Sequence, residues 1–150
     1  MRITKRTNIA FRILMFCGVN GDRLVTKSEI ADRCKTSESH LAQVINHLAQ
    51  QGFLYTQRGR AGGIALARPS DQIEIGDVFR RLEANTALAE CFADVDNTCP
   101  LVSGCRLRVA LADAMEAFYA HLDGLTLADL ICGNQALFDI IAPARCPERA

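Results

Sequence analysis

The sequence has no uninterrupted apolar run near the roughly 20 residues that a membrane-spanning helix needs. Its basic first residues are followed by a stretch that Asn8 and Arg12 interrupt, so the apolar core of a signal peptide is missing as well. These two absences argue against an integral membrane protein and against a secreted one. We therefore expect a cytoplasmic protein that has no membrane partner.

The usual arrangements of catalytic residues are also absent. The sequence shows no nucleophile paired with a base, no glycine-rich phosphate loop and no paired acids. We therefore expect that the protein is not an enzyme.

The chain has 150 residues, of which 49% are hydrophobic, enough for one core extended by a dimerisation element. Its net charge is zero, but the charges are divided unevenly. Residues 1–70 carry eleven Lys and Arg against four Asp and Glu, whereas residues 71–150 carry six against thirteen. This division predicts a basic face for a polyanion and a separate acidic module, with chance segregation of charge as the alternative.

Three helices are expected at the start of the chain. Apolar positions at helical spacing place them over residues 7–17, 26–34 and 37–51. Thr26 and Glu29 have the spacing of a capping box, in which two side chains satisfy amide groups at a helix start. Ser37 is placed to cap the third helix, and Gly52 is placed to end it.

A hairpin is expected after the three helices. Two β-prone runs, residues 53–57 and 64–67, flank a loop rich in glycine and arginine, as in a hairpin with a long loop. A fourth helix is expected over residues 74–84, with Ile75, Val78, Phe79 and Leu82 facing inward. Three helices followed by a hairpin predict a mainly α fold with a small β-hairpin wing, a winged helix-turn-helix domain over residues 1–84.

The second half contains a loop and a long helix. Residues 85–105 have little periodicity, and an irregular segment this long is uncommon unless it is functional. Residues 106–123 form a helix with one apolar side: Leu107, Leu111, Ala114, Met115, Phe118 and Leu122. With two shorter helices, near 126–132 and 134–142, this helix makes up a dimerisation unit over residues 106–142, and residues 143–150 are a tail.

The third helix has the composition of a helix that reads DNA. Opposite its apolar stripe lie side chains that can hydrogen-bond base edges in a major groove, namely Ser39, His40, Gln43, Asn46 and His47. In the hairpin, Arg58 and Arg60 alternate with glycines that let the backbone approach a phosphate or a minor groove. Phosphate contacts are also expected from Arg2, Lys5, Arg6 and Arg12. The expected partner is double-stranded DNA; the alternatives are a solvated polar helix and a turn that only closes the hairpin.

Seven cysteines in a reducing cytoplasm indicate metal binding or redox chemistry rather than disulfides. Cys91, Cys99 and Cys105 lie in the irregular segment, and the C-x2-C pairs typical of zinc sites are absent. A long loop lets three thiolates converge on an iron–sulfur cluster and leaves one iron without a cysteine ligand from this loop. We expect these residues to hold such a cluster, 4Fe–4S or alternatively 2Fe–2S; three incidental thiols are the other interpretation.

The remaining cysteines lack such spacing. Cys17 and Cys132 are expected to pack as small hydrophobic residues in apolar helices. Cys34 ends the second helix and Cys146 lies in the tail. His121 is expected to be an exposed or core histidine rather than a ligand.

Nearly the whole chain resembles the bacterial winged-helix iron–sulfur transcription regulators that include IscR, NsrR and RirA. The resemblance rests on Met1-Arg2-Ile3-Thr4-Lys5, on Arg58-Gly59-Arg60-Ala61-Gly62-Gly63-Ile64-Ala65-Leu66, and on Cys91, Cys99-Pro100-Leu101 and Cys105-Arg106-Leu107. It implies a homodimer built on the long helix, with each cluster loop near the partner's first helix. It also implies that Ser39, His40 and Gln43 touch bases, and that the protein is a transcriptional regulator, in the first place a repressor.

Members of this family differ in the fourth cluster ligand. The NsrR type takes an aspartate from the first helix of the other subunit, and Asn8 stands at that position here. The IscR type uses a histidine three residues after the third cysteine, and here that residue is Arg108. RirA-type iron sensors have similarly spaced cysteines and an open fourth site, whereas residues 126–130 look more like NsrR. The resemblance favours a sensor of iron availability; the alternatives are a nitric-oxide sensor and a cluster-free thiol-redox regulator.

Overall fold

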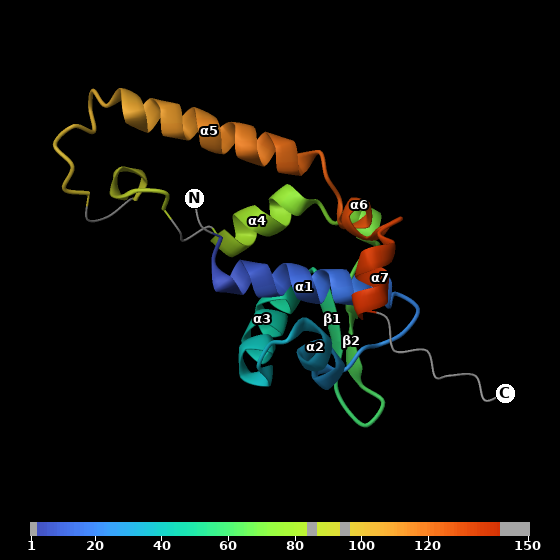
Figure 1. Ribbon diagram of the computed structural model, residues 1–150. Helices are drawn as coiled ribbons and strands as arrows, with labels where there is room; N and C mark the ends of the chain where they lie inside the picture. Colours follow the sequence, from blue (N-terminus) through green and yellow to red (C-terminus); the bar gives the residue numbers. More distant parts are fainter. Residues whose placement is uncertain (1–2, 84–86, 94–96, 142–150) are drawn as a thin grey trace.

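The computed structural model describes residues 3–83, 87–93 and 97–141, and within these ranges the chain is mainly helical with one small sheet (Figure 1). The elements of the first half are α1 (Lys5–Val19), α2 (Lys27–Cys34), α3 (Glu38–Gln50), β1 (Leu54–Gln57), β2 (Gly63–Leu66), η1 (Ser70–Gln72) and α4 (Ile75–Glu83). Those of the second half are η2 (Glu90–Phe92), α5 (Arg106–Asp123), α6 (Leu127–Ile131) and α7 (Gln135–Ile141). No described helix has the length and apolarity needed to cross a membrane.

Helix α1 lies at the centre of the molecule and contacts α2, α3, α4, α6, α7 and β2. Its N-cap residue Thr4 accepts a hydrogen bond from the Thr7 amide, and its inner face buries Ile13, Leu14 and Phe16. Fully burying side chains of this size contributes about 1.5–3 kcal/mol each. Because so many elements pack on α1, the helix is the core of the fold.

The wing is an antiparallel hairpin in which Leu54 pairs with Leu66 and Gln57 with Gly63. Val25, just before α2, forms a bridge to Ile64 and so attaches the hairpin to the helices. At the tip, a Cβ on Gly62 would lie 2.3 Å from the Gln57 carbonyl oxygen. Only glycine fits there, so the turn explains this part of the glycine-rich sequence.

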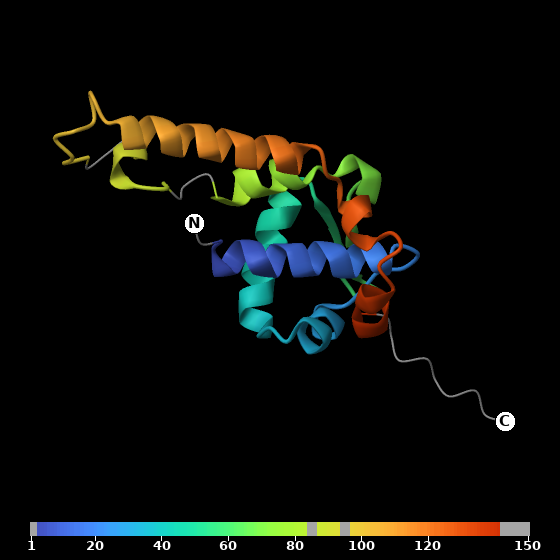
Figure 2. The ribbon, with the colours of Figure 1, turned by 45° about the horizontal axis from the view of Figure 1, so that its top comes forward.

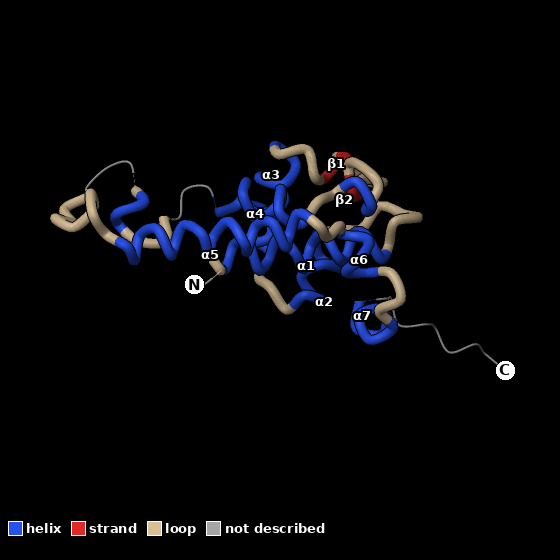
Figure 3. The backbone as a smooth tube through the Cα atoms, turned by 90° about the horizontal axis from the view of Figure 1, so that it is seen from above, coloured by secondary structure: helices blue, strands red, loops and turns tan. Residues whose placement is uncertain are grey.

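Helices α4 and α5 lie side by side (Figures 1 and 2), across α1 from the hairpin tip (Figure 1). Ile75, Val78 and Leu82 of α4 are buried, as predicted, whereas Phe79 is half-buried and stacks between Phe11 and Phe118. Helix α5 contains no buried residue. Its first turns and the segment before it project beyond the body of the molecule (Figure 3). Other residues of the same chain therefore cover the apolar side predicted for α5 only in part.

After α5 the chain returns to the core. Thr126 and Asp129 form a capping box that starts α6, where Leu127 and Ile131 are buried. The Leu127 amide donates to the Ile73 carbonyl at 2.8 Å, and Ile141 of α7 is buried as well. Helices α6 and α7 thus pack on the winged-helix half.

The predicted order of three helices, hairpin and fourth helix is confirmed, with element ends shifted by about one to two residues. The capping box of Thr26 and Glu29 is present, and Gly52 has the positive φ of 76° expected after a helix end. Ser37 is the N-cap residue of α3, but its side chain forms no capping hydrogen bond and instead lies 3.4 Å from the Ser39 hydroxyl.

Candidate functional site

The outer face of α3 carries the side chains that the sequence predicted for DNA reading. Ser39, His40, Gln43 and Asn46 are all exposed, while Leu41, Val44, Ile45 and Leu48 are buried on the opposite face. His47 is only half-buried, and its Nε2 atom is buried and finds no hydrogen-bond partner among the described residues. The outward face of α3 therefore consists mainly of Ser39, His40, Gln43 and Asn46.

A groove runs between α3 and the wing. It is lined by Ala42, Ile45 and Asn46 of α3, by Thr26 and Lys27 at the start of α2, and by Thr56, Gln57, Arg58, Gly62, Gly63 and Ile64 of the hairpin. Arg58 and Arg60 are exposed, and neither has an ion pair or hydrogen bond within the described ranges. Asn46 of α3 and Arg58 of the wing thus lie on the two sides of one groove, whereas Ser39, His40, Gln43 and Arg60 are exposed without lining it.

The arginines of α1 have internal partners. Arg6 donates to the Leu82 carbonyl at 2.8 Å, which joins α1 to α4, and Arg12 donates to the Cys34 carbonyl at 3.0 Å, which joins α1 to α2. Lys5 is exposed, and Arg2 lies outside the described residues. Two of the four side chains, those of Arg6 and Arg12, thus bind carbonyl groups of the chain itself. The phosphate contacts expected of the four residues stay a prediction.

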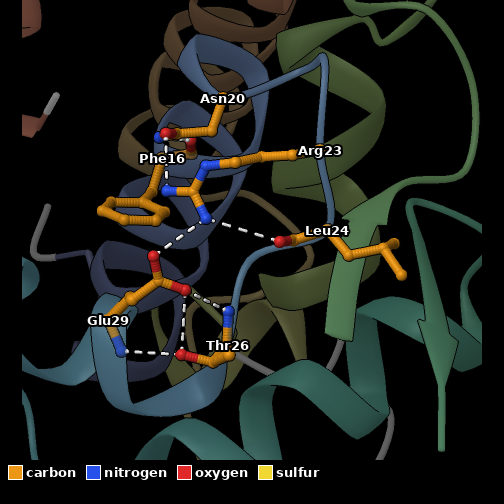
Figure 4. A network of polar contacts seen from close by, with 6 residues as sticks. All are labelled: Phe16, Asn20, Arg23, Leu24, Thr26 and Glu29. Carbon is orange, nitrogen blue, oxygen red and sulfur yellow. Dashed lines mark hydrogen bonds and ion pairs between the residues drawn. The ribbon is translucent and has the colours of Figure 1, made fainter. Parts of the chain in front are cut away.

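A polar network fixes the start of α2 (Figure 4). Glu29 accepts hydrogen bonds from the amide and hydroxyl of Thr26 at 2.7 and 2.9 Å, and forms an ion pair with Arg23 at 2.8 Å. Arg23 also donates to Asn20 at the end of α1. Burial raises the pKa of Glu29, but the hydrogen bonds from Thr26 and the charge of Arg23 outweigh this and leave it lowered. The network connects the end of α1 to the start of α2. No pattern in the sequence had indicated that Arg23 takes part in it.

The three clustered cysteines lie at and before the N-terminal end of α5. Cys91 is in η2, Cys99 is in the following loop, and Cys105 is the N-cap residue of α5; all three are free and half-buried. The Arg108 amide donates to the Cys105 sulfur at 3.4 Å, and Arg108 Nε donates to the Cys91 carbonyl at 3.0 Å. Arg108 therefore connects the first and third cysteines.

The chemistry of this cysteine segment, residues 87–105, fits an iron–sulfur cluster. Thiolates hold such clusters, and the segment offers three cysteines, of which Cys105 is the N-cap residue of α5. No three His, Cys, Asp or Glu side chains in the described ranges are yet arranged to hold a metal ion. The three thiols are present, and to bind a cluster their sulfur atoms must move closer together.

The other cysteines have different surroundings. Cys17 and Cys34 are buried, and burial together with the neighbouring Cys34 raises the pKa of Cys17 to about 12, so that this thiol stays protonated. The expectation of a packed Cys132 is wrong: the residue is exposed, because it follows α6 as its extended C-cap and no longer lies on the helix's inner face. Cys146 lies outside the described residues.

Two further residues that the sequence singled out lie elsewhere on the surface. Asn8 is exposed in the first turns of α1, and its side chain forms no hydrogen bond with any described residue. His121 is exposed in the last turn of α5, away from the cysteines at the other end of that helix.

A protein-family model described as "Iron-dependent Transcriptional regulator" (Rrf2) matches residues 3–133. The chain is 41% identical to the HTH-type transcriptional regulator NsrR of Geobacillus kaustophilus, over 97% of this chain and 99% of the relative. It is also 41% identical to the HTH-type transcriptional repressor NsrR of Streptomyces coelicolor, over 87% of this chain and 88% of the relative.

Among solved structures, that of T. potens IscR is similar to this fold, with a TM-score of 0.67 and 25% sequence identity. The match covers 87% of this chain and 85% of the IscR chain.

Proposed function

This chain belongs to the Rrf2 family of transcriptional regulators, and we propose that it acts as a homodimeric repressor whose iron–sulfur cluster senses iron availability. The protein is a DNA-binding regulator and not an enzyme. To this family membership the proposal adds an iron–sulfur cluster, its three ligands Cys91, Cys99 and Cys105, a homodimer, and iron availability as the signal.

One observation carries the cluster proposal: three cysteines lie in one irregular segment that ends at the start of α5, and Arg108 contacts two of them. A structural role for these thiols has little support, because none is fully buried and none forms a disulfide. The family description names iron, and two relatives carry the name NsrR. Three thiolates leave one iron of a 4Fe–4S cluster open to exchange, which is the property that a sensor of iron needs.

The dimer proposal rests on α5. This helix of 18 residues buries none of its side chains within one chain. Leu107 and Val109 are 66% and 61% exposed, and Leu101 just before the helix is 66% exposed. An exposed apolar patch of this kind, at the start of a helix that buries no side chain, is typical of an interface, and two-fold pairing of identical chains is the commonest arrangement. A second copy packed along α5 would cover it.

The proposed dimer also explains how the cysteine segment could control DNA binding. A dimer reads two half-sites about 34–36 Å apart, so a small change in the distance between the two α3 helices reduces specific binding. Residues 87–105 join α4 of the winged helix to α5 of the interface. A change in the conformation of this segment would therefore alter how each winged helix sits on the dimer. Such coupling requires that the two cluster states bind DNA unequally.

The signal follows from the fourth ligand. Asn8 is a poor iron ligand, and an arginine such as Arg108 carries no free electron pair for a metal at neutral pH. This favours an open iron that is lost when iron is scarce. The second candidate is a nitric-oxide sensor, supported by the identity to relatives named NsrR over most of the chain. A cluster-free thiol regulator is the third.

The experiment that tests the proposal is anaerobic purification of the wild type and of Cys91→Ala, Cys99→Ala and Cys105→Ala. We expect a brown wild type with charge-transfer absorption and bound iron and sulfide, and loss of stable cluster binding in each variant. Cys132→Ala, at an exposed cysteine outside the segment, is the matched control and should keep the cluster. A colourless wild type, or full occupancy in Cys99→Ala, would contradict the ligand assignment.

A further inference from the structure

Arg108 makes three contacts with the cysteine segment. Its backbone amide donates to Cys105 Sγ at 3.4 Å, its Nε donates to the Cys91 carbonyl oxygen at 3.0 Å, and its guanidinium lies 5.5 Å from the centre of the Phe92 ring. Cys91 and Phe92 belong to η2, whereas Arg108 is in the first turn of α5. One side chain therefore joins two elements on either side of the segment.

Little else holds η2 in place. The turn contains no buried residue, and its own backbone bonds, from Phe92 to Ala89 and from Ala93 to Glu90, are local. The other side-chain hydrogen bond of the turn among the described residues is the 3.4 Å bond from Thr98 to Glu90, which stays within the segment. A short turn with exposed hydrogen bonds and no buried apolar residue opens easily. The contact with Arg108 is thus the described link between η2 and a long helix.

We propose that Arg108 is the positioning residue of the cysteine segment. Its guanidinium holds η2, and with it the backbone of Cys91, beside the first turn of α5, which Cys105 caps, before any cluster is bound. The same side chain places a positive charge at the segment whose thiolates must approach one another, and this charge offsets part of their mutual repulsion. This inference rests on the proposed cluster function and adds a residue that is not itself a ligand.

The first test uses the cluster-free, full-length protein and measures amide hydrogen exchange over residues 87–93. Arg108→Gln removes the charge and the Nε donor, and we expect exchange in η2 to become about two- to tenfold faster, the range that one hydrogen bond contributes. Arg106→Gln is the matched control, because Arg106 is an exposed arginine of the same helix turn with no hydrogen bond or ion pair among the described residues. It should leave exchange unchanged. Equal exchange in the wild type and Arg108→Gln would overturn the proposal.

The second test separates the two roles of the side chain in the cluster-bound protein. Arg108→Gln should release the cluster to a chelator about two- to tenfold faster and shift its midpoint potential downward, because losing a nearby cation disfavours adding an electron. Arg108→Lys keeps the charge but lacks the planar guanidinium, so it should retain the wild-type potential and still show faster exchange in η2. An unchanged release rate and potential in Arg108→Gln would contradict the role toward the cluster.

The two tests also distinguish this inference from the proposed function. If the wild type binds no cluster, the proposed function fails, and the exchange experiment still decides whether Arg108 holds η2. If the wild type binds a cluster and Arg108→Gln behaves as Arg106→Gln does, the cluster proposal stands and the role of Arg108 is wrong.

Discussion

Glu83, the last residue of α4, accepts hydrogen bonds from both the backbone amide and the hydroxyl of Thr4, at 3.1 and 2.7 Å. Thr4 is the N-cap residue of α1, so a carboxylate from α4 completes the cap of the central helix. The charge also suits this position, because a helix N-terminus favours an anion. Glu83 ends α4, the last helix before the cysteine segment. Its bonds to Thr4 therefore fix the end of α4 to the start of α1.

Replacing Glu83 with alanine should lower the free energy of unfolding by about 1–3 kcal/mol, because two partly buried donors of Thr4 lose a charged acceptor. Urea denaturation at neutral pH measures this change. Glu74→Ala is the control, since Glu74 is an exposed glutamate just before the same helix, and its side chain forms no described ion pair or hydrogen bond. Equal midpoints for the two variants would show that Glu83 does not support the cap.

The network around Glu29 predicts a pH dependence of stability. The pKa of Glu29 is lower in the folded protein than the ordinary value of 4.5, so its contribution is present above that value and is lost as the pH falls through the folded pKa. Glu29→Gln should therefore reduce stability at neutral pH and flatten the decline below about pH 4.5. Thermal unfolding at a series of pH values measures both. Asp71→Asn, at an exposed acid, should keep the wild-type slope.

Gln43 is expected to contact a base, because it lies on the exposed face of α3. Gln43→Ala should relax the preference at one base position and cost about 1–3 kcal/mol there. Arg60→Ala on the wing should instead weaken binding to all sequences, since phosphate contacts carry little sequence information. Binding to a set of single-base operator variants distinguishes the two patterns. Gln50→Ala, at the exposed end of the same helix, is the control. Unaltered sequence preference in Gln43→Ala would mean that α3 does not read the site at this position.

Asn8→Asp tests the open fourth ligand. If the open iron faces residue 8 of the partner, a carboxylate there should bind it, and the cluster should decay more slowly under an iron chelator. Asn134→Asp, an exposed asparagine before α7, provides a matched control and should decay as the wild type does. Equal decay in Asn8→Asp and the wild type, together with rapid loss of DNA binding on adding nitric oxide to the wild type, would favour the gas-sensing alternative.

Features that depend on a few neighbouring residues could be predicted from the sequence. The capping box of Thr26 and Glu29, the apolar stripe of α3 and the bounds of α5 all follow from spacing within one or two helical turns. The polar face of α3 and the three clustered cysteines were found in the same way. Local periodicity determines which face of a helix is apolar, and these faces are where the sequence places them.

The tertiary structure alone decided which distant groups meet. Thr4 and Glu83 are 79 residues apart, and Arg108 and the Cys91 carbonyl are 17 apart; neither pair has a sequence signal. The return of α6 and α7 to α1, and the exposure of Cys132, likewise depend on how whole helices pack. A side chain's partners are set by the positions of helix axes, and these result from the burial of many apolar residues at once. For that reason the sequence could indicate which cysteines are candidate cluster ligands, but the contact between Arg108 and the Cys91 carbonyl emerged only from the fold.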